Sequence, residues 1–316
     1  MKRIKSIVTI LVIMGILLHL TSFAAKSQLS GFADIKFVLS DGTAEDESGI
    51  EKKFTAIAEL DYKRNLDNRM SIRIDLDFDT GGQGDSGQLE QAYFTWVSRG
   101  GLQFKGGVFN NHLGWEAEDA PDLYQITHGQ LYDIWDAKTA QFTGNNVSGI
   151  AILGKVGQAR VMGAFLNDLN GMDEENAMQV VVNFYPNKLL AAEVGMITQQ
   201  ETDAEPIIDG SLRYRKSKYL LGVELMQIQK EIDLAQSVTF NYKFNNKMDG
   251  TVRYDSVDNY EEEGAEEEKP RTSLTFAIRY KLHNNLTLKA EIREDTDENN
   301  DNEDGNIIRA EMVATF

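Results

Sequence analysis

The segment LTLKAEIRE, residues 286–294, decides the fold, because its side chains alternate strictly between apolar and polar. Leu286, Leu288, Ala290 and Ile292 fall on one set of positions, and charged or hydroxyl side chains fall between them. Successive side chains of a β-strand point to opposite faces, so this segment predicts a strand with one apolar and one hydrated face. The same alternation recurs along most of the chain, including residues 54–62, 70–79, 238–244 and 274–282.

The connections between these segments alternate between short and long. Tight turns are predicted near residues 65–68, 98–101, 154–157, 185–188, 216–218, 245–247 and 283–285. Longer connections are predicted at residues 41–53, 80–88, 111–146, 167–176, 198–205, 229–234, 258–272 and 295–305. This arrangement is typical of a transmembrane antiparallel β-barrel, with short turns at one end and long loops at the other. We therefore predict an all-β barrel of about sixteen strands, within a range of about 14 to 18.

The N-terminus has the pattern of a secretory signal peptide. Lys2, Arg3 and Lys5 precede an apolar run over residues 7–18, and small residues follow at Ser22 and Ala24. The run is short for a membrane anchor, which is the alternative interpretation. We therefore expect residues 1–24 to be cleaved and residues 25–316 to form the barrel.

Composition narrows the class of protein further. Hydrophobic residues make up 41% of the chain, and no later stretch approaches the ~18 apolar residues of a membrane helix. The 50 acidic residues outnumber the 32 basic ones, so we expect no nucleic-acid partner. There is no cysteine, and the four histidines lack metal-ligand spacing. We predict no enzyme, no catalytic residue, no cofactor and no metal site.

The ends of the strands support a barrel over a secreted β-sandwich, its closest rival. Aromatic residues lie near the predicted tight turns, as in the girdles of membrane barrels: Tyr62, Trp96, Phe104, Tyr185, Tyr214, Tyr219, Phe244 and Tyr280. The last predicted strand, residues 307–316, is amphipathic and ends at Phe316. It is similar to the insertion signal of bacterial outer-membrane proteins, which implies recognition by the barrel assembly machinery.

Residues beside the longest connection resemble the OmpL-like β-barrel porin-2 family. The likeness lies in LEQAY at 89–93, GVFN at 107–110, LGWE at 113–116 and DAPD at 119–122. The chain departs from it at Leu113, where many porins place Pro-Phe before the glycine. The resemblance implies passive diffusion of small hydrophilic solutes across the outer membrane of a Gram-negative bacterium, without a cofactor.

The connection 111–146 is the third long one, and we predict that it folds into the lumen; a solvent-exposed surface loop is the alternative. Alternation predicts lumen-facing cations at Arg73, Arg213, Arg253, Arg279, Lys281, Lys289, Arg293 and Arg309. The loop carries acids at Glu116, Glu118, Asp119, Asp122, Asp133 and Asp136. The hypothesis is a transverse field across a constriction, and the alternative is mutual neutralisation. Residues 130–135 could be a strand or part of the loop.

Two functions follow from these features. The first is a porin-like channel. The second is a plugged structural or adhesive barrel that binds external ligands or divalent cations through acidic loops, over residues 261–268 and 295–304. The stretch at 295–299 lacks the glycine of a calcium loop, so a solvated acidic surface is favoured there. Expected partners are outer-membrane lipid, lipopolysaccharide and small solutes, with a homotrimer as one option.

Overall fold

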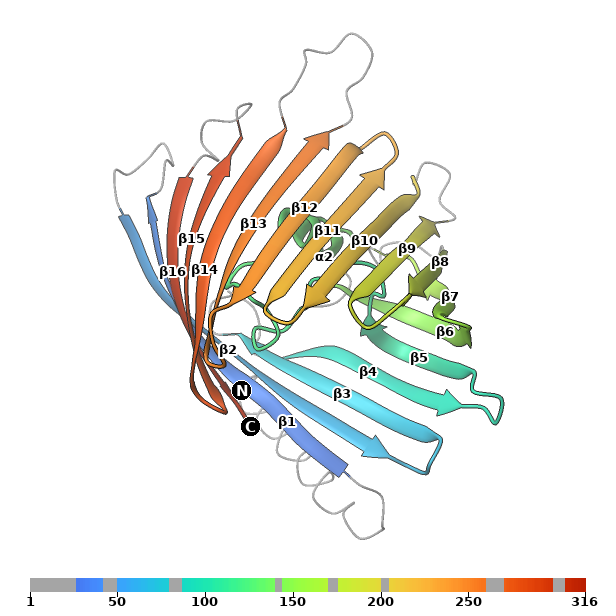
Figure 1. Cartoon of the computed structure of the whole chain (residues 1–316). Helices are drawn as coiled ribbons and strands as arrows, with labels where there is room; N and C mark the ends of the chain where they lie inside the picture. Colours follow the sequence, from blue (N-terminus) through green and yellow to red (C-terminus); the bar gives the residue numbers. More distant parts are fainter. Residues whose placement is uncertain are drawn as a thin grey trace, which may run out of the picture.

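The structure is a computed structural model that describes residues 27–41, 50–79, 87–139, 144–169, 176–199, 205–259, 270–297 and 305–316. These residues form sixteen strands and one helix (Figure 1). The elements are β1 (Ser27–Asp41), β2 (Ile50–Asn65), β3 (Met70–Asp79), β4 (Gln88–Val97), β5 (Gln103–Asn110), α2 (Gln130–Lys138), β6 (Asn146–Val156), β7 (Ala159–Asn167), β8 (Asn176–Phe184), β9 (Leu190–Gln199), β10 (Ile207–Lys216), β11 (Tyr219–Ile228), β12 (Ile232–Lys243), β13 (Met248–Asn259), β14 (Arg271–His283), β15 (Leu286–Thr296) and β16 (Gly305–Thr315). The predicted signal peptide and residues 261–268 lie outside the described residues.

The strands form a closed antiparallel barrel, in which each strand pairs with its neighbours in sequence and β1 pairs with β16. The seam runs from Phe32 opposite Thr315 to Ser40 opposite Ile307. Closure leaves no strand edge, so the backbone of every strand finds partners on both sides without water. The predicted barrel of sixteen antiparallel strands is confirmed.

The two ends of the barrel differ in their connections. At one end, called the turn end here, short connections join β2 to β3, β4 to β5 and so on to β15, and β16 ends there as well. Gly157 and Ser217 stand in two of these turns with positive φ values of 61° and 52°. The opposite end is called the loop end. The connection predicted as long at 229–234 is a tight turn over residues 229–231, because β12 already begins at Ile232.

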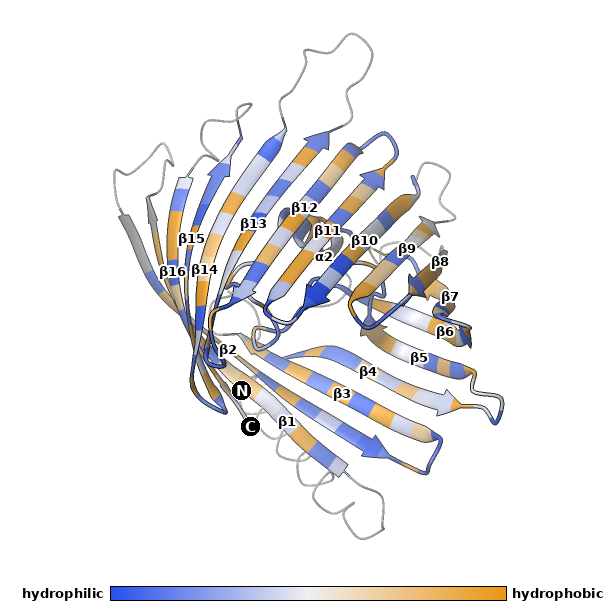
Figure 2. Cartoon of the chain, viewed as in Figure 1, coloured by the Kyte–Doolittle hydropathy of each residue, from blue (hydrophilic) through white to orange (hydrophobic). Residues whose placement is uncertain are grey.

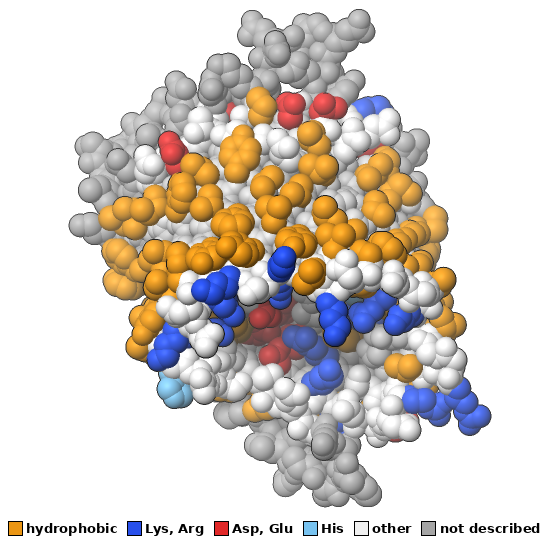
Figure 3. Space-filling model, viewed as in Figure 1, with side chains coloured by type: hydrophobic (Ala, Val, Ile, Leu, Met, Phe, Trp, Pro, Cys, Tyr) orange, Lys and Arg blue, Asp and Glu red, His pale blue; other side chains and the backbone are white. Residues whose placement is uncertain are grey.

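The outer surface carries the apolar half of the alternation. Outward residues such as Phe276, Ile278 and Ile292 are each at least half exposed, and hydropathy alternates along the strands in Figure 2. Figure 3 shows hydrophobic side chains gathered in a broad band, with Lys and Arg side chains below it. A continuous exposed apolar band is unfavourable in water and matches the hydrocarbon of a bilayer. The exterior of the barrel is therefore built to face lipid.

Aromatic side chains border the band at the turn end. Trp96 lies against Phe104, with ring centroids 5.2 Å apart, and Tyr242 lies between Tyr219 and Phe244 at 5.2 Å from each. Rings with a polar edge favour the boundary between lipid and water. Trp96, Phe104, Tyr219 and Phe244 belong to the girdle that the sequence predicts, and Tyr242 lies among them although it was not predicted. Within the described residues, no helix is long and apolar enough to cross a membrane.

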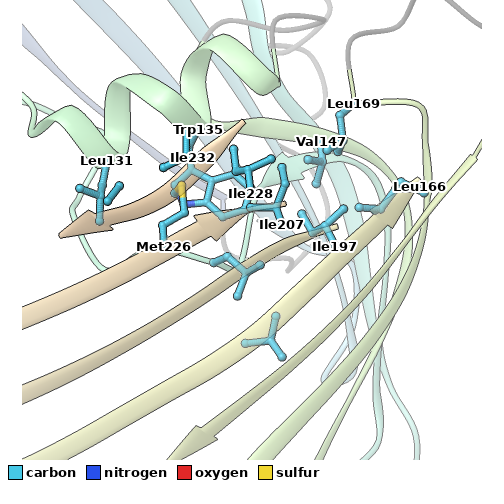
Figure 4. Packing of buried hydrophobic residues seen from close by; sticks show 14 of the residues in the cluster. Leu131, Trp135, Val147, Leu166, Leu169, Ile197, Ile207, Met226, Ile228 and Ile232 are labelled. Carbon is cyan, nitrogen blue, oxygen red and sulfur yellow. The ribbon is translucent and has the colours of Figure 1, made fainter. Parts of the chain in front are cut away.

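An apolar cluster fills part of the barrel interior (Figure 4). It joins Leu131 and Trp135 of α2 to the inner faces of β5–β13, with members such as Leu166, Ile197 and Ile228. This cluster explains why both faces of β6 and β7 are apolar or small: one face meets the exterior and the other packs inside the lumen. The interior is therefore not a uniformly hydrated channel.

Candidate pore constriction

Residues 111–145 leave β5 after Asn110 and return to β6 at Asn146. The two ends of this loop are tied together, because the backbone N of Asn111 donates to the carbonyl O of Asn145 over 2.8 Å. Side chains add a second tie of 3.1 Å between Asn111 Nδ2 and Asn145 Oδ1. Gln179 of β8 donates to Asn111 Oδ1 over 2.6 Å. The loop therefore starts from a base fixed to the wall.

The segment that the sequence left open, residues 130–135, begins helix α2, which lies inside the barrel (Figure 1). A strand is not available to it, because a closed barrel offers no edge with which another strand could pair. A helix satisfies its own backbone and can stand inside the lumen. Its buried residues Leu131 and Trp135 lie one turn apart and face the apolar cluster (Figure 4).

Two glycines on the wall make room for the loop. A Cβ atom at Gly195 would come within 2.5 Å of Leu113 Cδ2, and one at Gly222 within 2.5 Å of the Trp115 ring. Both distances are below contact, so a larger residue at either position would displace the loop. These inward-facing glycines in otherwise regular strands are a sequence signal of close approach.

Arg253 joins the loop to β13 and is 1% exposed. Its Nη1 donates to Glu116 Oε1 over 2.9 Å, and its Nε donates to Asp255 Oδ2 over 2.9 Å. The same guanidinium donates to the carbonyl oxygens of Thr127 and His128, over 2.9 and 2.7 Å. Arg253 therefore lies on the inner face of β13, where the loop encloses it.

Three more of the predicted lumen cations also donate to loop carbonyls. Arg279 Nη1 reaches Leu123 O over 3.3 Å, and Arg293 Nη1 reaches His128 O over 3.0 Å. Lys289 Nζ donates to Ala120 O over 2.5 Å and to Gln125 O over 3.1 Å. Each also forms an ion pair on the wall, with Asp249, Asp295 and Glu311 respectively. The basic wall therefore holds the loop backbone.

Glu291 on β15 completes this attachment, although alternation alone did not single it out. Its carboxylate accepts hydrogen bonds from the backbone N of Ile126 and Thr127, over 2.7 and 3.0 Å. Arg309 lies 3.4 Å from the same carboxylate. Arg73 belongs to a separate group on the other side of the seam, where it pairs with Asp61 and Asp75 over 3.0 and 2.6 Å.

The predicted loop acids fall into three environments. Glu116 is in direct contact with Arg253. Glu118 and Asp119 lie beside an acidic part of the wall, and carboxylate oxygens of Asp119, Glu59 and Glu90 lie within 4.8 Å of one another. The remaining acids, Asp122, Asp133 and Asp136, are exposed. Glu116 therefore faces a cation of the wall, as the hypothesis of an acidic loop opposite a basic wall requires. Glu118 and Asp119 instead face other carboxylates of the wall.

Glu118 is half-buried in a place where negative charge is unfavourable. Burial, and then the nearby Glu90 carboxylate, raise the pKa of Glu118 to about 10. The same two causes raise the pKa of Asp119 to about 6. Asn110 and Asn146 each donate a hydrogen bond to Glu118. The raised pKa favours the protonated form of Glu118 at the base of the loop.

The loop leaves openings on both of its sides. A cavity of about 400 Å³ on the loop-end side is lined by Gln130, Asp133 and Arg293 among others. Two cavities of about 510 and 550 Å³ lie on the turn-end side. Inward-facing cations gather at the turn end: Lys63, Lys105, Lys155, Arg160, Arg213, Arg215, Lys243 and Lys281. The wall also carries three acids near the turn end. Asp61 and Asp249 are each paired with an arginine, and the third acid is Glu193.

Solved structures that align with this chain include an outer membrane channel, an outer membrane protein and a porin. The outer membrane channel DcaP of Acinetobacter baumannii aligns over 94% of this chain and 99% of its own, with a TM-score of 0.68 and 12% identity. OmpT of Vibrio cholerae lacking loop L8 aligns over 93% and 100%, with a TM-score of 0.66 and 13% identity. A mutant of Rh. blastica porin aligns over 92% and 100%, with a TM-score of 0.63 and 12% identity. No family model matches the chain, and no curated protein matches it in sequence. The chain has the fold of the outer-membrane porins and channels.

Proposed function

We propose that this protein is a porin-like channel, through which small hydrophilic solutes or ions cross the outer membrane of a Gram-negative bacterium by passive diffusion. The observation that carries the proposal is a lipid-facing barrel whose lumen is narrowed by a tethered inward loop, with polar cavities on both sides of the loop. Charged groups at such a constriction determine which ions enter.

Single-channel recording in a planar bilayer tests the proposal directly. The purified, folded barrel should give stepwise currents in potassium chloride, and proteoliposomes containing it should swell in small neutral sugars. A variant in which a short Gly-Ser linker replaces residues 113–138 should give a larger unit conductance, because it removes the constriction. A folded barrel that stays silent in both assays contradicts the proposal.

The packing of the loop also supports a second candidate, a plugged structural or adhesive barrel. Arg253 and the apolar cluster fix the loop in place, as expected for a permanent plug. The same linker variant separates the two candidates. A plugged barrel conducts only after residues 113–138 are removed, whereas a channel conducts with its natural loop.

The partners follow from the exterior of the barrel. Its apolar band supports contact with outer-membrane lipid, and lipopolysaccharide is the proposed contact of the acidic loop end. The amphipathic strand β16 with Phe316 supports recognition by the barrel assembly machinery. A homotrimer and membership of the OmpL-like porin-2 family remain proposals, the latter supported by the residues quoted above.

A further inference from the structure

A basic cavity of about 510 Å³ lies on the turn-end side of the loop. Its floor is loop sequence, including Trp115, Leu123 and Tyr124. Asn284 and Thr315, at the turn end of the barrel, also line it. The lining also includes four wall cations: Arg213, Arg215, Arg279 and Lys281.

The charges in this cavity do not cancel. Arg279 is paired with Asp249 over 3.0 Å, and the lining residue Glu116 is paired with Arg253 over 2.9 Å. Arg213, Arg215 and Lys281 form no salt bridge with any residue that the structure describes. Against these three cations, the lining contributes the exposed carboxylate of Asp122.

Glu193 on the neighbouring strand is also close enough to Arg213 for its charge to interact with the guanidinium. It does not line this cavity but the one of about 550 Å³ next to it. Even if Glu193 is counted as an anion beside Asp122, the three unpaired cations outnumber the acids. The cavity therefore has a positive field.

Tyr124 arranges two of the cations. Arg215 Nη2 donates to the Tyr124 hydroxyl over 2.8 Å, and the guanidinium carbon of Arg279 lies 4.8 Å from the centroid of the Tyr124 ring. Contact with one ring restricts both long side chains and reduces the entropy that a ligand would have to remove. In addition, Arg213 Nε is buried and has no hydrogen-bond partner in the described part of the chain. A buried N–H group without an acceptor is energetically unfavourable, and a ligand oxygen that accepts its hydrogen bond would remove this cost.

We infer that this cavity binds small organic anions that carry carboxylate or phosphate groups, on the turn-end side of the constriction. Guanidinium groups bind planar carboxylates and phosphates through paired hydrogen bonds, and Lys281 adds a mobile charge. A volume near 500 Å³ suits a small solute, and the Trp115 and Leu123 side chains accommodate a carbon skeleton. For its role in transport, the inference rests on the channel function proposed above.

Binding is tested first without any requirement for conduction. The purified, folded barrel in neutral detergent is titrated with citrate and with inorganic phosphate by calorimetry, and glycerol is the neutral probe. Citrate should bind, phosphate should bind more weakly because it spans fewer cations, and glycerol should not bind. A hydrogen bond between charged groups adds to the binding free energy, and R213Q/R215Q removes two such donors. The double variant should therefore weaken citrate binding by about tenfold or more.

The matched control is K243Q, which removes one inward cation at the same end of the barrel but does not line the cavity. The variant K281Q tests the cavity without touching Tyr124, in case the double variant does not fold. K281Q should weaken citrate binding, and K243Q should leave it unchanged. Equal weakening by K243Q would show a general charge effect and would overturn the site.

Bilayer recording then separates the two proposals. Citrate added on the turn-end side should block single-channel current at lower concentration than citrate added on the loop-end side, and R213Q/R215Q should remove this difference. A barrel that conducts but neither binds nor is blocked by citrate overturns the anion site and leaves the channel. A barrel that binds citrate and never conducts overturns the channel and leaves the site.

Discussion

Arg253 shows how a lumen-facing cation behaves when a loop packs over it. Its guanidinium lies between Glu116 and Asp255 and also donates to two loop carbonyls. Substitution R253M would leave both carboxylates without their main cationic partner. Removal of one partner of a buried ion pair costs about 3–5 kcal/mol, so we expect a lower thermal unfolding temperature and noisier single-channel currents.

The control for this prediction is K243M, because Lys243 is exposed and inward-facing. A surface substitution of this kind changes stability by about 0.5 kcal/mol or less. Equal unfolding temperatures for R253M and K243M would show that the Arg253 network does not hold the loop.

Glu118 makes the stability of the loop base depend on pH. The pKa of Glu118 is raised from 4.5 to about 10, so the folded protein keeps a proton that the unfolded chain releases above pH 4.5. The free energy of unfolding should therefore fall as pH rises from about 4.5 toward 10. E118Q, which imitates the neutral side chain, should show a smaller fall in unfolding temperature between pH 6 and pH 9. D122N, at an exposed loop carboxylate, serves as the comparison and should follow the natural protein. Identical profiles for all three proteins would refute a raised pKa at Glu118.

At the scale of elements, helix α2 is expected to depend on a single large anchor. Trp135 is 1% exposed and lies in the apolar cluster. W135A should leave a cavity and weaken the attachment of the loop to the wall by about 3–5 kcal/mol. We expect a lower unfolding temperature and a larger or less steady single-channel conductance. D136A, on the exposed side of the same helix, should behave as the natural protein does. An unchanged W135A channel would mean that the helix is held by its polar contacts alone.

The strands were predictable and the helix was not, for a physical reason. A strand in a barrel is decided by its own alternation, as in residues 286–294, because lipid and lumen lie on opposite faces of every strand. Residues 130–135 lie inside the barrel, so they do not separate lipid from lumen and their sequence shows no strand alternation. Their conformation depends on Met226, Ile228 and Ile232, which are distant in sequence.

The site was predictable only in part for the same reason. Arg253, Arg279 and Arg293 donate hydrogen bonds to loop residues, and alternation along a strand cannot say whether an inner residue meets water or a loop. Glu291 was missed because a carboxylate that accepts backbone hydrogen bonds has no local pattern. Gly195 and Gly222 were the available signals, since an inward glycine in a strand indicates a neighbour at short range.

Across the whole molecule, charge is divided along the barrel axis as well as across it. Inward cations gather at the turn end, and the carboxylates of Glu59, Glu90 and Asp119 lie together further inside. The sequence-based hypothesis considered only a field across the constriction. An axial component makes the two entrances of the channel unlike each other, whereas the side-dependent citrate block expected above depends on the cavity cations Arg213 and Arg215.

The seam between β1 and β16 has a consequence for how the barrel forms. Every other strand pair joins neighbours in sequence, whereas this pair brings Phe32 to Thr315. The chain entropy lost in bringing two such distant residues together is ~5 kcal/mol. That loss must occur before the last ladder of hydrogen bonds can compensate for it, so assembly is expected to be slow and cooperative. Opening the closed barrel requires this ladder to break and leaves two strand edges unpaired, so the barrel should persist by its slow rate of unfolding more than by its equilibrium stability.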